Sequence, residues 1–328
     1  MTSFTLTCIG RQQNTHDVVS WQLAPLSSSL PPVLAGQCIT LHTEIDGQPE
    51  CRAYTLSSSP QDACWQVTIK DVGRVSRHLH QTLQVGDKIR VDGPFGDFNL
   101  TALPCERPLL LSAGSGITPM WAMLRDELTK RPDADIRFIH SARSPADVIF
   151  ADDLAAVAEA HAGVRHALIL EQAPSNHPWI GRLTPAMLAE LAPDLRERHV
   201  YLCGPAPYMA AVSAMLAELG LPPEQLHQES FGLPPADPAT TSDHFWLTLK
   251  KSGKKVKILP GQTLLAALEA AGETMMAACR AGVCGSCRCT TTGDIERQSV
   301  ITLSAQDLES GVALACSCTA KGDISLDY

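Results

Sequence analysis

The sequence predicts a multidomain protein: an antiparallel β-barrel domain, an α/β domain with a parallel sheet, and a small α+β domain. Three observations predict this order. Short alternating segments fill the first hundred residues, apolar strands then alternate with amphipathic helices, and six of the twelve cysteines lie in the last fifty residues. With 328 residues and 45% hydrophobic content, the chain is long enough for several cores. We expect domains at 1–103, 104–232 and 244–328, with a linker at 233–243.

Turn signals such as Asp46-Gly47 divide the first hundred residues into short segments that favour β structure. Strands at this spacing are typical of a small antiparallel barrel. One helix fits here, shortly after Gly73. The expected elements are strands at 5–9, 18–23, 38–43, 51–56, 65–69 and 88–91 and a helix at 76–83.

From Pro108 onward, short apolar runs alternate with amphipathic stretches, which is the pattern of a parallel sheet covered by helices. We expect the first of these helices to begin at Pro119, with Thr118 as its N-cap. The expected strands lie at 109–112, 136–140, 165–170 and 200–203, and the expected helices at 119–129, 151–160, 185–191 and 207–219.

Residues 233–243 are rich in proline and polar side chains, and we expect them to form an extended linker. A strand pair at 245–250 and 255–258 and a helix at 263–271 follow it. The cysteine-rich loop and a few short strands then complete the third domain.

Charge and hydropathy exclude several classes of function. The net charge of −9 leaves no basic stripe to neutralise phosphates, so we expect no nucleic-acid partner. The first residues lack a signal-peptide pattern, and apolar runs are interrupted long before bilayer length. We therefore expect a cytoplasmic protein without membrane insertion, and a monomer.

Three cysteines in the last domain have the spacing C-x4-C-x2-C, and a fourth follows downstream. This is the ligand spacing of plant-type 2Fe–2S clusters, which accept and pass one electron. Gly282, Gly285 and Ser286 supply the small residues that a loop needs to wrap a cluster closely. The predicted metal ligands are Cys279, Cys284, Cys287 and Cys316.

A structural zinc site is the alternative, because Cys284-x2-Cys287 and Cys316-x-Cys318 also make two close pairs. It leaves Cys279 and the glycines without a role, so the iron–sulfur interpretation is favoured. On that interpretation Cys289 and Cys318 are surplus, and we expect them to be core thiols rather than ligands.

The segment Arg52-Ala-Tyr-Thr-Leu-Ser57 has the alternation of an ordinary strand, but it also allows a specific interpretation. Its guanidinium can hold a phosphate, its tyrosine can lie against a flat isoalloxazine ring, and its hydroxyls can reach the ring's polar edge. Downstream, Gly73-Arg-Val-Ser76 precedes a helix, whose N-terminus suits a pyrophosphate. The candidate flavin-binding residues are Arg52, Ala53, Tyr54, Thr55, Ser57, Gly73, Val75 and Ser76.

Two glycine turns follow apolar strands of the predicted parallel sheet, at Gly114-Ser-Gly-Ile-Thr118 and at Cys203-Gly-Pro205. The first is not the usual G-x-G-x-x-G, and such a turn also occurs for structural reasons alone. Ligands bind at the carboxyl ends of parallel strands, however, and a glycine backbone can approach a nicotinamide nucleotide closely there. The candidate residues are Gly114, Ser115, Gly116, Thr118, Cys203, Gly204 and Pro205.

The ordered set Arg-Ala-Tyr-Thr, Gly-x-x-Ser, Gly-Ser-Gly-Ile-Thr-Pro, Cys-Gly-Pro and C-x4-C-x2-C resembles the ferredoxin–NADP reductase superfamily, in its flavoproteins with a C-terminal plant-type ferredoxin domain. The likeness covers nearly the whole chain. Asp147-Val-Ile-Phe-Ala-Asp152 and Gly181-Arg-Leu-Thr184 further resemble the NADH oxidoreductases that serve hybrid-cluster proteins. The resemblance implies FAD, NADH and a 2Fe–2S cluster as cofactors, and a β-grasp fold for the last domain.

The resemblance also implies roles for the flavin-binding positions. Arg52 and Thr55 would contact the flavin's phosphate and ribityl region, and Tyr54 would stack on its ring. Ser76 would meet the pyrophosphate. The segment 93–98, Gly-Pro-Phe-Gly-Asp-Phe, resembles FAD-binding rather than FMN-binding members.

Further positions are implied for the nicotinamide side. Gly114, Thr118, Cys203 and Gly204 would border the nicotinamide path, and Phe231 would lie in the segment that approaches the flavin. Tyr54 and Cys203 are therefore the predicted catalytic residues, with Cys203 orienting the nicotinamide rather than attacking it.

The resemblance predicts a relay in which NADH delivers a hydride to the flavin and the cluster passes single electrons to a protein acceptor. We expect this acceptor to be hybrid-cluster protein. The alternative is the reductase component of an oxygenase or desaturase, and the third interpretation is a non-catalytic redox-sensing metal-binding protein. NADPH stays open beside NADH, because Arg143 could meet a 2′-phosphate, whereas Asp147 and Asp152 favour an unmodified ribose.

Overall fold

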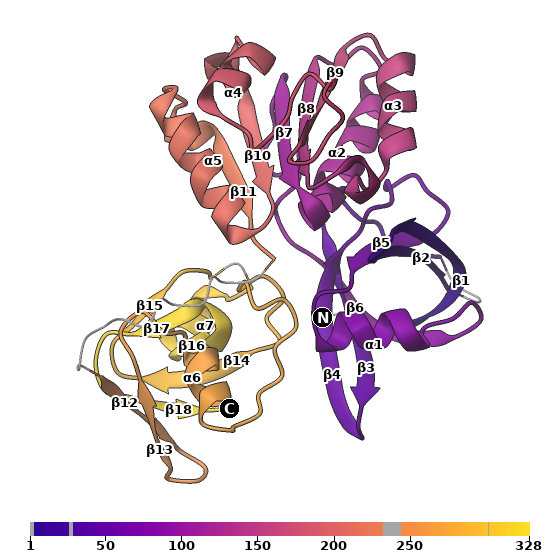
Figure 1. The fold of residues 1–328 in the computed structure, drawn as a ribbon. Coiled ribbons are helices and arrows are strands. Elements are labelled where there is room, and N and C mark those ends of the chain that lie inside the picture. The colour runs from indigo at the N-terminus through magenta and orange to yellow at the C-terminus, as the bar shows by residue number, and fades with distance from the viewer. Residues whose placement is uncertain (1–2, 26–28, 232–243, 301) are drawn as a thin grey trace. The chain divides into compact units, whose positions relative to one another are not determined.

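The computed structural model describes residues 3–25, 29–231, 244–300 and 302–328, and it confirms the predicted fold class (Figure 1). Contacts divide the chain into two compact units. One contains Met1–Ile39 and Tyr54–Ser230, and the other contains Thr40–Ala53 and Phe231–Tyr328. The predicted linker at 233–243 lies outside the described residues, and the predicted domain boundaries stay a prediction.

The first sheet has six strands in the order β4-β3-β6-β1-β2-β5. Strand β1 pairs antiparallel with both β2 and β6, and β2 pairs with β5, so several neighbours are not consecutive in the chain, as in a Greek-key arrangement. Val75 and Leu79 of helix α1 are buried, and the Trp21 indole nitrogen donates to the Leu83 carbonyl oxygen at 3.2 Å beyond the helix end. The elements are β1 (Ser3–Thr15), β2 (Val18–Ala24), β3 (Cys38–Ile45), β4 (Gln48–Thr55), β5 (Trp65–Lys70), α1 (Arg74–Thr82) and β6 (Lys88–Phe95).

The second sheet is parallel and has the strand order β11-β10-β7-β8-β9. Apolar side chains of α2 and α3 pack on one of its faces, and those of α4 and α5 pack on the other. The buried strands are apolar on both faces, as expected for a covered parallel sheet. The elements are β7 (Pro108–Ala113), α2 (Ile117–Lys130), β8 (Ile136–Ala142), α3 (Ala151–Ala160), β9 (Val164–Leu170), α4 (Pro185–Leu191), β10 (His199–Cys203), α5 (Ala206–Glu218) and β11 (Leu226–Glu229).

One predicted helix start is wrong. Helix α2 begins at Ile117, so Thr118 lies inside its first turn, and Gly116 occupies the N-cap position. The glycine turn Gly114–Gly116 forms a 3₁₀ turn that runs directly into the helix. The Thr118 hydroxyl therefore donates to the Ser115 carbonyl oxygen at 3.1 Å instead of accepting a capping hydrogen bond.

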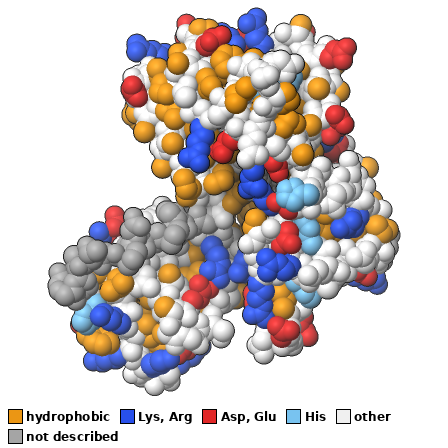
Figure 2. All heavy atoms as spheres, in the orientation of Figure 1, with side chains coloured by type: hydrophobic (Ala, Val, Ile, Leu, Met, Phe, Trp, Pro, Cys, Tyr) orange, Lys and Arg blue, Asp and Glu red, His pale blue; other side chains and the backbone are white. Residues whose placement is uncertain are grey.

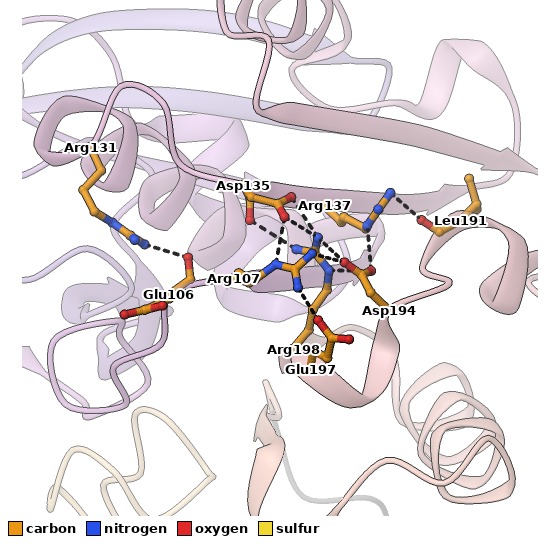
Figure 3. A network of polar contacts seen from close by, with 9 residues as sticks. All are labelled: Glu106, Arg107, Arg131, Asp135, Arg137, Leu191, Asp194, Glu197 and Arg198. Carbon is orange, nitrogen blue, oxygen red and sulfur yellow. Dashed lines mark hydrogen bonds and ion pairs between the residues drawn. The ribbon is translucent and has the colours of Figure 1, made fainter.

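A network of ion pairs holds together the segments at the amino ends of the parallel strands (Figure 3). The fully buried guanidinium of Arg198 donates to both Asp135 and Asp194, with four of these contacts at 2.8 Å. Asp194 also accepts from Arg107 and Arg137. A buried guanidinium is tolerated only when it is paired in this way. The network lies at the opposite end of the sheet from the glycine turns.

The second unit contains a five-stranded mixed sheet in the order β13-β12-β18-β14-β16 and a two-stranded sheet of β15 and β17. Helix α6 packs Leu264, Leu265 and Leu268 into the core of this unit. The elements are β12 (Phe245–Leu249), β13 (Lys255–Ile258), α6 (Leu264–Ala270), β14 (Arg288–Thr292), β15 (Ile295–Arg297), α7 (Ala305–Glu309), β16 (Val312–Leu314), β17 (Cys318–Ala320) and β18 (Ile324–Asp327).

The visible surface mixes cationic and anionic side chains, without a patch of one sign on the face that Figure 2 shows. Among the described residues, no helix is both long enough and apolar enough to span a bilayer.

Candidate functional site

The cysteine loop of the second unit directs backbone N–H groups at the predicted ligand sulfurs. The Cys279 Sγ accepts from Ala281 and Val283 at 3.4 and 3.3 Å. The Cys316 Sγ accepts from Gly282 at 3.2 Å, and Gly282 has a φ of +75°, which glycine adopts without strain. A Cβ atom on Gly282 would also lie 2.6 Å from the Cβ of Ser299.

The remaining two sulfurs have donors as well. The Cys284 Sγ accepts from the Cys279 N–H at 3.4 Å, and the Cys287 Sγ accepts from the Cys316 N–H at 3.5 Å. Ser286 adds a side-chain contact, with its Oγ 3.1 Å from the Cys284 Sγ. The Ala278 N–H donates to this Oγ at 2.8 Å, which leaves the hydroxyl proton for the sulfur. Every predicted ligand therefore has the environment that a thiolate of an iron–sulfur cluster requires.

The pKa of Cys279 reflects this environment. Hydrogen bonds from the Cys284 and Cys316 thiols hold the pKa of Cys279 far below the ordinary thiol value, and the N–H groups of Ala281 and Val283 lower it further against the effect of burial. The same contacts raise the pKa values of Cys284 and Cys316, which shows that these predicted ligand thiols lie close to one another. Among the described residues, no group of three or more His, Cys, Asp or Glu side chains has the geometry to hold a single metal ion.

The two surplus cysteines lie in the apolar core, as expected. Cys289 is 5% exposed and Cys318 is fully buried, and both pack among the core residues of this unit. Burial raises the pKa of Cys289 to about 12. It raises the pKa of Cys318 as well, so neither thiol ionises near neutral pH.

The predicted flavin-binding residues are divided between the two units. Arg52, Ala53 and Phe231 belong to the second unit, in which the Ala53 N–H donates to the Ala278 carbonyl oxygen at 3.2 Å. Within that unit the Arg52 Nη1 also donates to the Ala277 carbonyl oxygen at 3.4 Å. Phe231 is 47% exposed. Flavin contacts of these three residues stay a prediction.

The other flavin candidates lie in the first unit: Tyr54, Thr55, Ser57, Gly73, Val75 and Ser76. The Ser57 Oγ lies 2.8 Å from the Thr68 Oγ1, inside the barrel. The Ser76 Oγ accepts from the Gly73 N–H at 2.9 Å and so fixes the start of α1. Tyr54 is partly exposed at the end of β4. Their flavin contacts are likewise predictions.

The two glycine turns of the parallel sheet meet. A Cβ atom on Gly116 would lie 2.3 Å from the Cys203 carbonyl oxygen, and one on Gly204 would lie 2.8 Å from the Tyr208 ring. Only glycine allows these backbones to approach so closely. Gly114 has a φ of +52°, and no atom lies within 4 Å of the position of its missing Cβ.

A cavity of about 510 Å³ opens at this carboxyl edge of the sheet. Gly114, Pro205 and Tyr208 line it at the turns, and Arg143 and Glu171 line it beyond β8 and β9. Its size and position fit a nucleotide. A smaller cavity of about 280 Å³ lies beside Asp194, at the amino edge of the sheet, and contains none of the turn residues.

Several cavity residues were not predicted from the sequence: Ser141, Glu171, Arg182 and Tyr208. Each follows or flanks a strand end, and the rule that ligands bind at the carboxyl ends of parallel strands is the signal that would have found them. Asp147 lines the cavity, whereas Asp152 is exposed and is absent from its lining.

Cys203 ends β10 and is completely buried. Burial raises the pKa of its thiol well above the ordinary value, and the Glu229 carboxylate on the neighbouring strand raises it further. The residue is therefore a neutral thiol near pH 7, which suits orientation of a bound ring and not nucleophilic attack.

Three family models match consecutive parts of the chain. Residues 10–100 match the oxidoreductase FAD-binding domain, and residues 110–214 match the oxidoreductase NAD-binding domain. Residues 247–321, which include all four predicted ligands, match the 2Fe-2S iron-sulfur cluster binding domain. The iron–sulfur interpretation thus replaces the zinc alternative.

Whole-chain relatives decide the family. The glycine betaine monooxygenase reductase subunit of Chromohalobacter salexigens is 36% identical over 305 residues, covering 86% of this chain and 83% of the relative. The chain belongs to the family of FAD- and 2Fe–2S-containing reductases. A second member of this family, the NADH oxidoreductase HCR of Escherichia coli, is 35% identical over 303 residues, covering 91% of this chain and 89% of the relative.

Solved structures agree with this reductase fold. The match to phthalate dioxygenase reductase covers 99% of this chain and 98% of that protein, with a TM-score of 0.65. At 24% identity it shows a likeness in fold. An intact type IV self-sufficient cytochrome P450 monooxygenase covers 99% of this chain with a TM-score of 0.69 and 28% identity, although the match covers 40% of that protein. The reductase is therefore an NAD(P)H-dependent electron-transfer enzyme that uses FAD and a 2Fe–2S cluster.

Proposed function

We propose that this reductase takes electrons from NADH and delivers them to a separate oxygenase protein. Relatives that match nearly the whole chain carry the proposal, because they are named as reductase subunits of a glycine betaine monooxygenase and of a stachydrine N-demethylase. A reductase named as a subunit implies a separate acceptor protein, and the three matched domains of this chain would supply the cofactors for such a transfer.

The preference for NADH over NADPH is supported by Glu171. It follows β9 at the carboxyl edge of the sheet and lines the cavity. A carboxylate there can accept hydrogen bonds from an unmodified ribose and would repel a 2′-phosphate. Arg182 lies 3.3 Å from this carboxylate, and Asp147 adds a second carboxylate to the lining.

A second candidate acceptor is hybrid-cluster protein, as the sequence motifs first indicated. The Asp147–Asp152 and Gly181–Thr184 segments support it, and so does the Escherichia coli relative, whose name denotes an NADH oxidoreductase. Both candidate functions would use the same cofactors, so they differ only in the protein that receives the electrons.

The chain's own residues would bind the cofactors and orient the nicotinamide ring. When bound, the flavin takes a hydride from the nucleotide and the cluster takes one electron at a time. The close contacts of Gly116 and Gly204 would fix the two turns beside the nicotinamide, and the neutral Cys203 thiol would hold its ring in place. Cys279, Cys284, Cys287 and Cys316 would hold the iron, with the loop N–H groups stabilising negative charge on sulfur.

Anaerobic titration of the purified reductase with NADH and with NADPH tests the donor, with flavin and cluster reduction followed by optical and EPR spectra. We expect full reduction at lower concentrations of NADH than of NADPH. Equal or reversed preference would contradict the role of Glu171. Adding purified oxygenase component or hybrid-cluster protein to the reduced enzyme then tests the acceptor, and reoxidation by hybrid-cluster protein alone would favour the second candidate.

A further inference from the structure

Two hydroxyl groups in the nucleotide cavity make no hydrogen bond of ordinary length and angle with the described residues, apart from a weak contact with each other. They belong to Ser141, near the end of β8, and to Tyr208, in the first turn of α5. Both oxygen atoms are buried from solvent, and both residues line the cavity of about 510 Å³. The two hydroxyls are thus buried polar groups at the wall of a space that a ligand can enter.

Other buried hydroxyls of the same domain are paired. The Ser112 Oγ lies 2.9 Å from the His140 Nδ1, and the Thr118 Oγ1 donates to the Ser115 carbonyl oxygen. The Tyr201 hydroxyl donates to the Leu103 carbonyl oxygen. Burying a hydroxyl without a good partner is unfavourable. Two such hydroxyls at one cavity therefore need a specific reason.

The two residues flank the end of β7, where the first glycine turn begins. Ser141 is the register partner of Ala113, the residue before Gly114. The Tyr208 ring packs against the second turn, at the position that a Cβ on Gly204 would occupy. Burial raises the pKa of Tyr208 above the ordinary tyrosine value, so its hydroxyl keeps its proton and remains a donor.

The surroundings favour an anionic ligand at these donors. The cavity lining has three cationic side chains, Lys70, Arg143 and Arg182, against the carboxylates Asp147 and Glu171. Helix α5 has 13 residues and begins at the same edge, so its positive dipole end adds to this potential. The open side of Gly114 leaves room for a group of the size of a phosphate.

We propose that the Ser141 and Tyr208 hydroxyls bind the diphosphate of the nicotinamide dinucleotide, each donating to a phosphate oxygen. The inference rests on the proposed use of a nicotinamide nucleotide and adds two specific contacts to it. These contacts position the dinucleotide between the Cys203 turn and the Glu171 edge of the cavity. Neither hydroxyl takes part in the chemistry.

Ser141→Ala and Tyr208→Phe test the proposal, with binding of NAD⁺, ADP-ribose and adenosine to the full-length protein measured by calorimetry. Each change should weaken NAD⁺ and ADP-ribose about 5-fold, as expected for the loss of one hydrogen bond to a charged group, and should leave adenosine binding unchanged. The double variant should lose more than either single variant. Flavin absorbance and melting temperature report that the fold is intact.

Matched controls are Tyr201→Phe and Ser213→Ala. The Tyr201 hydroxyl has a backbone partner and the Ser213 hydroxyl bonds Gln228 on the surface, so neither change should alter nucleotide affinity, although Tyr201→Phe should lower the melting temperature. Unchanged NAD⁺ affinity in both test variants would overturn the proposal and indicate that the hydroxyls bond only to water. If the unmodified protein binds neither NAD⁺ nor ADP-ribose, the proposed function itself fails.

Discussion

The backbones of Gly116 and Cys203 lie so close that a Cβ atom on Gly116 would stand 2.3 Å from the Cys203 carbonyl oxygen. The contact joins two turns that are almost ninety residues apart in the chain and that form one edge of the nucleotide cavity. The geometry of this edge therefore depends on a residue without a side chain.

Gly116→Ala should push the two turns apart. Overpacking of this kind costs about 1 to 3 kcal/mol, and we expect NAD⁺ binding to weaken by roughly 10-fold or more while flavin remains bound. Gly163→Ala is the matched control, because its Cβ would lie equally close, at 2.3 Å, to the Ala134 carbonyl oxygen at the other end of the sheet. It should lower stability without changing NAD⁺ affinity. Equal loss of affinity in both variants would show that the Gly116 effect is a general loss of stability.

Cys203→Ala should slow reduction of the flavin by NADH and leave the spectrum of the bound flavin unchanged. The buried thiol would orient the nicotinamide. Because its raised pKa keeps it neutral, the pH dependence of the flavin reduction rate in the unmodified enzyme should show no thiol ionisation near neutral pH. Stopped-flow absorbance measures both quantities. An unchanged reduction rate in the variant would remove Cys203 from the catalytic residues.

Asp194→Asn should destabilise the nucleotide-binding domain by about 2 to 3 kcal/mol at neutral pH, because it leaves the buried Arg198 with one carboxylate partner. Hydrogen bonds from Arg198 hold the pKa of Asp194 well below its usual range. A lowered folded-state pKa contributes stability above the ordinary aspartate pKa of about 3.9, and this contribution is lost as the pH falls further. The variant should therefore lose less stability on acidification than the unmodified protein.

Urea unfolding at neutral and acidic pH measures this difference. Glu296→Gln serves as control, since Glu296 pairs with Lys321 on the surface and both side chains are more than half exposed. Its unfolding midpoint should stay close to that of the unmodified protein. Parallel acid sensitivity of the Asp194→Asn variant and the unmodified protein would contradict the role assigned to Asp194.

Ser286→Ala should lower the midpoint potential of the cluster. The Ser286 hydroxyl donates to the Cys284 sulfur, and such a hydrogen bond stabilises the additional negative charge of the reduced cluster. Ser286→Thr keeps the hydroxyl and should restore the potential towards its original value. A redox titration followed by EPR measures the shift, and identical potentials in the alanine variant and the unmodified protein would refute the contact.

Much of the fold could be predicted because periodicity marks buried strands and amphipathic helices. Strand β11 was missed, since Leu226-His-Gln-Glu229 is a short edge strand with one apolar residue and is held mainly by pairing with β10. Strand β1 extends to Thr15 because its polar second half pairs along β2, a long-range contact without a local signal.

The candidate site, like the fold, could be predicted from the sequence only in part. The cysteine spacing and the glycine turns carry their chemistry in local sequence, so the cluster-binding domain and the cavity edge could be predicted, and the four ligand assignments stay a prediction. Ser141, Glu171 and Tyr208 lie in or beside three separate elements, and only Tyr208 stands near a motif, three residues after the Cys203-Gly-Pro205 turn. Only the strand order places them at one cavity. Thr118 was assigned as a cap because the 3₁₀ turn before the helix has no sequence signature.

The central claim is that electrons leave this reductase through the cysteine loop. Its most direct test compares two activities of Cys284→Ser: reduction of ferricyanide by NADH, which the flavin alone can support, and reduction of the purified acceptor protein. We expect the variant to retain most of the ferricyanide activity and to lose acceptor reduction. Acceptor reduction at the unmodified rate, in a variant shown by EPR to lack the cluster, would contradict the account.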